Sequence, residues 1–225
     1  MPATVRITRP RLALAALVVA AALAALGIGS LTDASTARGQ DRQVTTKALA
    51  LHDSMRALWE SHGTWTERAI VDFVGDLPDT QLAVTRLLRN QTEIGNAVKP
   101  FYGRKAGNRL TALLKGHINA AVALLQAAKS GDSDATAKAK AAFYANGNQV
   151  ARFLHAANPR RWSRQAMKRM MRIHLDQVVG LAVDQLQGRY AAAVRLYDVY
   201  IGHILDMADM LSTGIMQQFP ARFSS

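Results

Sequence analysis

The chain has 225 residues, 49% of them hydrophobic, and its 28 Lys and Arg against 16 Asp and Glu give a net charge of +12 at pH 7. It has no cysteine, which excludes disulfide scaffolds, cysteine-ligated zinc sites, iron–sulfur clusters and thiol nucleophiles. The apolar fraction is that of a packed globular domain, so we expect stability to come from packing alone.

The first 37 residues have the pattern of an export signal. Three arginines before residue 12 precede an uncharged, Ala- and Leu-rich stretch over residues 12–28, and small residues follow at positions 35–37. This pattern predicts a signal peptide over residues 1–37, or an uncleaved membrane anchor, because the apolar stretch just reaches the length of the shortest spanning helix. In both cases the positive-inside rule predicts an exported, extracytoplasmic protein with a single domain over residues 38–225.

Prolines and glycine-containing turns divide the rest of the chain. Proline inside a helix costs about 3 kcal/mol, so helix boundaries are expected at Pro78, Pro100, Pro159 and Pro220. With turns at residues 130–132 and 187–188, these boundaries define six segments: 44–75, 79–99, 103–129, 132–157, 163–187 and 189–218. Each has apolar residues three and four apart, and none alternates with a period of two. The sequence therefore predicts an all-α, up-and-down antiparallel bundle of about six long helices.

Four of these segments carry a histidine on the apolar face near the middle: His62, His117, His174 and His203. Because successive helices are antiparallel and joined by short loops, these side chains are expected to face inward at similar heights. The two remaining segments place the amides Gln91 and Asn146 at comparable positions. The sequence thus predicts a polar layer inside an otherwise apolar core.

Two interpretations of this layer stay open. Buried imidazoles need hydrogen-bond partners, and a closed network with buried water would supply them. Alternatively, the four histidines bind a metal ion or small ligand, as bundle cores often do. Neutral imidazoles with the nearby thioethers of Met170, Met171 and Met207 favour copper or zinc, with haem as a third alternative, although methionine also simply fills cores. Asp206, one turn beyond His203, is expected to orient that imidazole.

Positive charges gather at the start of the fifth segment. The expected basic face consists of Arg161, Arg164, Lys168 and Arg172, and Trp162 lies among them as an expected interfacial anchor. Such a face solubilises a protein, or binds anionic membrane or cell-wall polymer when it lies outside the cell. Nucleic acid is not an expected partner, because the chain is predicted to be exported and has no recognition motif.

No catalytic motif stands out in the chain. It has no G-x-S-x-G elbow, no glycine-rich phosphate loop and no H-E-x-x-H sequence. The first hypothesis is therefore a non-enzymatic binding protein whose histidine layer takes copper, zinc or haem. The alternative is a cell-envelope structural or attachment protein that uses the basic face.

Several motifs together resemble a known family. They are LWESH at 58–62 with Trp65-Thr66, residues 86–96, KPFYG at 99–103, residues 110–118, Asn158-Pro159, HIL at 203–205 and QFP at 218–220. This set is similar to a family of exported, all-helical proteins of Gram-positive bacteria. The resemblance implies a helical exported fold, and it matches Gln91 and the four histidines to family positions without assigning them a role. Members are often labelled acetylglutamate kinase, which the sequence does not support, because such a kinase needs an α/β fold and a phosphate-binding loop.

Overall fold

The computed structural model describes residues 45–224, and the predicted leader over residues 1–37 lies outside the described residues. The described chain forms α1 (Thr46–Val74), α2 (Thr80–Ser130), α3 (Ser133–Ala157), α4 (Arg164–Leu186) and α5 (Tyr190–Gln218), followed by the 3-10 turn η1 (Pro220–Arg222). No strand occurs between residues 45 and 224, which confirms the all-α class. None of these helices is long and apolar enough to span a bilayer.

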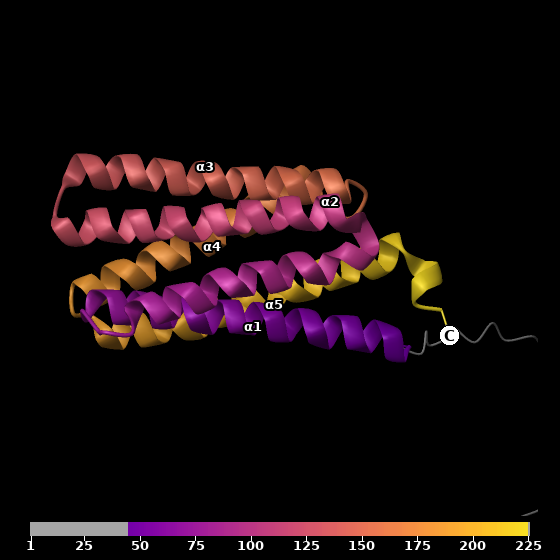
Figure 1. Ribbon diagram of the computed structural model, residues 1–225, viewed down its shortest axis with the longest axis horizontal. Helices are drawn as coiled ribbons and strands as arrows, with labels where there is room; N and C mark the ends of the chain where they lie inside the picture. Colours follow the sequence, from indigo (N-terminus) through magenta and orange to yellow (C-terminus); the bar gives the residue numbers. More distant parts are fainter. Residues whose placement is uncertain (1–44, 225) are drawn as a thin grey trace, which may run out of the picture. The chain divides into compact units, whose positions relative to one another are not determined.

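Residues 45–224 form five helices where about six were predicted, because segments 79–99 and 103–129 are two helical stretches joined by a kink within α2. Pro100 lies inside α2, and the helical conformation is interrupted three residues later, at Gly103, with φ 80° and ψ 167°. Glycine adopts a positive φ without steric cost because it has no Cβ. The chain folds back there, so that α2 consists of two arms, one beside α1 and the other beside α3 (Figure 1). The boundary expected at Pro100 was thus three residues early.

The two arms of α2 approach each other very closely. A Cβ on Gly95 would lie 2.8 Å from the carbonyl oxygen of Gly107, and a Cβ on Gly107 would lie 2.6 Å from that of Gly95. Real Cβ atoms essentially never come this close to another heavy atom. The side-chain-free glycines therefore let the backbones meet, and this contact sets the position of the second arm, which carries His117.

The five helices of the described chain form a closed ring. Each helix packs against the next one in the chain, α5 packs back against α1, and α4 also contacts α1 across the centre. Side chains of Thr45, Asp132 and Ser163 accept hydrogen bonds from first-turn amides and so define the starts of α1, α3 and α4. Because α1 and α4 each contact three other helices, their inward faces, which carry His62 and His174, lie inside the core.

Trp162 is not the interfacial anchor expected from the sequence. Its side chain is 2% exposed, its ring packs against Gly214 of α5, and its Nε1 lies 3.4 Å from the carbonyl oxygen of Met210. The turn between α3 and α4 carries Trp162 inward while the neighbouring Arg160 and Arg161 stay exposed. The large apolar area of the indole ring explains this placement, since its burial stabilises the fold.

Candidate functional site

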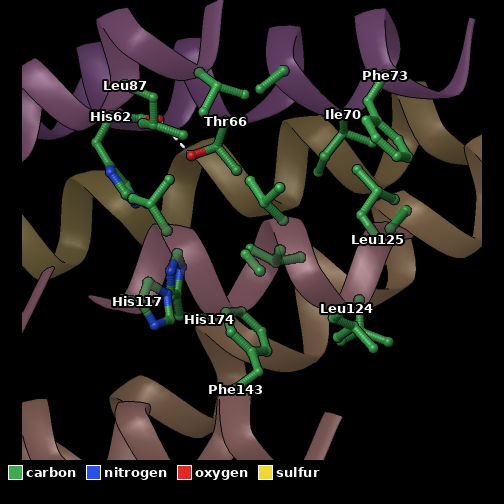
Figure 2. Close-up of a pocket in the computed structure, with 18 residues that line it drawn as sticks. His62, Thr66, Ile70, Phe73, Leu87, His117, Leu124, Leu125, Phe143 and His174 are labelled. Atoms are coloured by element: carbon green, nitrogen blue, oxygen red, sulfur yellow. Dashed lines mark hydrogen bonds between the residues drawn. The ribbon is translucent and has the colours of Figure 1, made fainter. Parts of the chain in front are cut away.

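Three histidines from three helices meet at the centre of the bundle. His62 of α1, His117 of the second α2 arm and His174 of α4 are each 2–3% exposed. His174 lies between the other two, with its ring centre 5.7 Å from each of theirs. Figure 2 shows the three labelled rings together at one end of an apolar pocket. We call His62, His117 and His174 the histidine cluster.

Hydrogen bonds to amides assign opposite tautomers to two of these histidines. Gln91 Nε2 donates to a main-chain carbonyl 2.8 Å away, which identifies it as the NH2 group, and it also lies 3.2 Å from His62 Nδ1. His62 Nδ1 therefore accepts, and its proton is on Nε2. Asn146 Nδ2 likewise donates to a carbonyl, so its Oδ1 accepts from His117 Nδ1 at 3.1 Å. His117 Nε2 then has a free lone pair.

His174 has hydrogen-bonding capacity that the protein leaves unused. Its Nδ1 is buried without a protein partner, as are Gln91 Oε1, Trp59 Nε1 and the hydroxyl of Tyr200. The ring of Tyr200 stacks on that of His174 at 5.8 Å. An unsatisfied buried polar group costs about 1–3 kcal/mol. A ligand that makes hydrogen bonds to these groups would therefore stabilise the folded protein.

All three imidazoles of the cluster are neutral at pH 7. Burial lowers the pKa of His62 to about 3, with a further contribution from His117, and burial lowers the pKa of His117 to about 4. Burial and then the other histidines hold the pKa of His174 well below 6.5. Neutral imidazole is the form that binds metal ions, because a ring nitrogen then has a lone pair.

Two cavities meet at the histidine cluster. The smaller one, of about 30 Å³, is lined by the cluster and by four thioethers, which are those of Met55, Met170, Met171 and Met207. We call it the methionine cavity. The three methionines expected from the sequence all line it, and Met55 is an addition that its position two turns before His62 could have indicated. The larger cavity, of about 60 Å³, is the apolar pocket of Figure 2.

His203 and Asp206 do not belong to the cluster. His203 is half-buried, its Nε2 lies 3.1 Å from the carbonyl oxygen of Met170, and it lines neither cavity. Tyr200, which is fully buried, holds the central position on α5 that was expected for His203. The expectation that Asp206 orients His203 was wrong, because Asp206 is exposed and His203 bonds to Met170 instead. Between residues 45 and 224, no three His, Asp or Glu side chains are placed to share a metal ion.

The predicted basic face forms an open hollow between α3 and α4. Its lining residues are Asn148, Arg164, Gln165, Lys168, Arg169 and Arg172. Arg172 is partly neutralised, since its Nε lies 2.9 Å from Asp176 Oδ2 and its guanidinium lies over the Tyr144 ring. Arg161 is exposed in the turn before α4 and does not line this basic hollow.

Comparison with known proteins adds no family, ligand or partner. No family model, curated protein or solved structure matches the chain. The function is therefore inferred from the histidine cluster, its two cavities and the basic hollow.

Proposed function

We propose that this protein is a non-enzymatic, extracytoplasmic binding protein that holds a transition metal ion, copper(I) first, in the methionine cavity. The observation that carries the proposal is that three neutral imidazoles and four thioethers line one buried cavity. Soft thioethers combined with imidazole favour Cu(I). Zinc prefers four closed tetrahedral ligands from cysteine, histidine and carboxylate, and no such set converges among the described residues. Copper is therefore the better match.

The geometry favours His117 and His174 as the imidazole ligands. An ion about 2.0–2.1 Å from one nitrogen of each ring places the ring centres roughly 5–5.5 Å apart. The observed separation of 5.7 Å needs only a small approach of the two side chains. Asn146 orients His117 from its far side, as partners of metal-bound histidines commonly do. His62 carries its proton on Nε2 and its Nδ1 accepts from Gln91, so it has no free lone pair for the ion and lines the cavity without being a ligand.

Haem is less compatible with these cavities than a single ion. Pockets for drug-sized ligands have volumes of roughly 300–1,000 Å³, whereas the two cavities at the cluster measure about 30 and 60 Å³. A porphyrin would require the helices to separate. We therefore propose a single metal ion as the ligand. A Soret band in the purified protein would instead identify the ligand as haem.

Copper binding is expected at about one Cu(I) per chain in the reduced, untagged protein, measured by competition with a chromophoric Cu(I) chelator. Losing an outer partner of a metal ligand costs 10- to 100-fold in affinity, so Asn146→Ala is expected to weaken binding by that amount. His174→Leu removes a ligand directly and is expected to weaken it more. Circular dichroism shows whether both variants keep their helices.

His203→Gln is the matched control for the copper experiment. Because His203 lines neither cavity, this variant is expected to keep wild-type copper affinity, whereas a site built from all four histidines would lose it. Unchanged copper binding in His174→Leu would contradict the proposal. If zinc binds more tightly than copper at the same residues, the cluster is a metal site, but its metal is zinc and the copper assignment is wrong.

The basic hollow supports a second candidate function, attachment to an anionic phospholipid surface. Each Lys or Arg near such a surface contributes about 1 kcal/mol. Lys168→Glu combined with Arg169→Glu is therefore expected to weaken binding to phosphatidylglycerol vesicles by roughly 30-fold or more, measured by co-sedimentation at low salt. Added salt is expected to weaken wild-type binding as well, since the charges are exposed.

Arg104→Glu combined with Lys105→Glu makes the same change in net charge at two α2 residues that do not line the hollow, and serves as the control. Both residues are exposed. Equal losses in the two double variants would mean that net charge alone drives the binding and that the hollow is only a solvated surface. Binding to an anionic wall polymer without binding to vesicles would mean that the partner of the hollow is the cell wall and not a phospholipid membrane.

A further inference from the structure

The apolar pocket reaches the histidine cluster from the side opposite to its methionines. It lies between α1, both arms of α2 and α4, and one aromatic ring of α3, that of Phe143, closes it. Apart from the cluster and Thr66, every lining residue is apolar. The Thr66 hydroxyl donates to the carbonyl oxygen of His62 at 2.8 Å, so it is already satisfied (Figure 2).

No formal charge lines this pocket. No Lys, Arg, Asp or Glu is among its lining residues, and its three histidines are only 2–3% exposed. Moving an ion from water into such surroundings costs several kcal/mol, because nothing there replaces its hydration. The pocket therefore discriminates strongly against charged molecules.

The pocket extends from the buried histidines to half-buried apolar side chains. In Figure 2, Phe73 and Leu124 lie at the end away from the histidines, and Ile70 lies between. Phe73 and Leu124 are half-buried, whereas Ile70 and the histidines are buried. The pocket thus comes nearest to the surface between apolar side chains near the end of α1, where Lys129 Nζ lies 5.2 Å from the centre of the Phe73 ring.

We propose that the apolar pocket binds a small, uncharged and largely apolar molecule of about four to six non-hydrogen atoms, with one end against the histidine cluster. The size follows from the volume of about 60 Å³, given that roughly 10–15 Å³ holds one water-sized group. Apolar cavities of this kind stay dry and take up xenon or small hydrocarbons. The site is separate from the methionine cavity and does not require copper.

The first test uses xenon and the metal-free protein, followed by NMR of the methyl groups. Saturable shift changes are expected at lining residues such as Ile70 and Val178, and not at methyl groups elsewhere in the bundle. Ala121→Leu fills the pocket and is expected to weaken xenon binding at least tenfold. Ala120→Leu makes the same change one residue earlier, outside the lining, and is expected to keep wild-type binding.

A matched pair of ligands tests the chemical class. 1-Butanol and n-butylammonium each have five non-hydrogen atoms, but only the first is uncharged. 1-Butanol is expected to shift the same methyl groups as xenon, and n-butylammonium is not. An equal response to both ligands, or equal xenon binding in Ala121→Leu and Ala120→Leu, would overturn the proposal.

A second variant and the use of metal-free protein make the xenon experiment informative in every outcome. If Ala121→Leu does not fold, Ala182→Leu fills the same pocket from a half-buried position on α4. Because xenon is offered to the metal-free protein, a failure of this experiment leaves the copper proposal standing. Conversely, Asn146 lies outside the pocket lining, so a loss of copper binding in Asn146→Ala is a result on the copper site alone.

Discussion

Lowering the pH from 7 towards 4 is expected to unfold the protein steeply, because its three central imidazoles stay neutral only in the folded state. An unfolded histidine takes up its proton near pH 6.5, whereas the pKa values of His62 and His117 in the bundle are about 3 and 4. Between these limits the unfolded chain binds more protons, so the free energy of unfolding falls as the pH falls.

The size of this effect is large compared with the stability of a domain. Each such histidine contributes a slope of about 1.4 kcal/mol per pH unit, so the cluster contributes up to about 4 kcal/mol per unit. Total stabilities are about 5–15 kcal/mol, so an acid midpoint near pH 5 is expected. Urea unfolding followed by circular dichroism at half-unit pH intervals measures the slope.

His174→Leu is expected to reduce that slope by about a third and to move the acid midpoint to lower pH. The change keeps a similar side-chain volume and removes a buried, unpartnered nitrogen. His155→Gln removes a histidine outside the cluster and serves as the control. A free energy of unfolding that does not change between pH 7 and pH 5 would mean that the cluster is hydrated and not buried as described.

Replacing Gly95 by alanine is expected to lower the free energy of unfolding by about 3 kcal/mol. The new Cβ would collide with the Thr111 side chain and would lie 2.8 Å from the carbonyl oxygen of Gly107, which cannot move without shifting the second arm of α2. Overpacking of this kind typically costs about 1–3 kcal/mol, with backbone contacts at the upper end. The two arms would be forced apart, and His117 would move relative to His62.

Gly202→Ala is the matched control, because it makes the same change in the middle of α5 where a Cβ meets nothing within 4 Å. Alanine is a better helix former than glycine, so this variant is expected to be more stable than the wild type by up to about 1 kcal/mol. Thermal unfolding of both variants gives the comparison. Equal melting temperatures for Gly95→Ala and the wild type would mean that the two arms are not in close contact.

The helical class and most of the cluster could be predicted from local information. The spacing of apolar residues determines which face of a helix is buried, and this places His62, His117 and His174 inward wherever the helices pack. The amides Gln91 and Asn146 followed from the same reasoning, and both bond to histidines of the cluster. Such periodicity is a property of each segment alone. The inward face of a helix can therefore be predicted correctly even when the predicted arrangement of the helices is wrong.

The predictions that failed concern positions near the edge of a face. His203 and Tyr200 are both within reach of the inward face of α5, and only the rotation of α5 against α4 decides that Tyr200 is buried and His203 bonds to a carbonyl at the rim. Trp162 sits among arginines in the sequence, yet packing against Gly214 places it in the core. Single residues at such borders depend on neighbours that are distant in the chain.

The sequence by itself thus determined an all-helical chain, the inward faces of its helices and the residue types available at its centre. Only the tertiary structure decided that α2 folds back at Gly103, that α4 contacts α1 across the ring, and that three histidines instead of four meet between a methionine cavity and an apolar pocket. The reason is physical. Periodicity acts within about two helical turns, whereas cavities, backbone contacts and the choice between neighbouring side chains depend on how whole helices fit together.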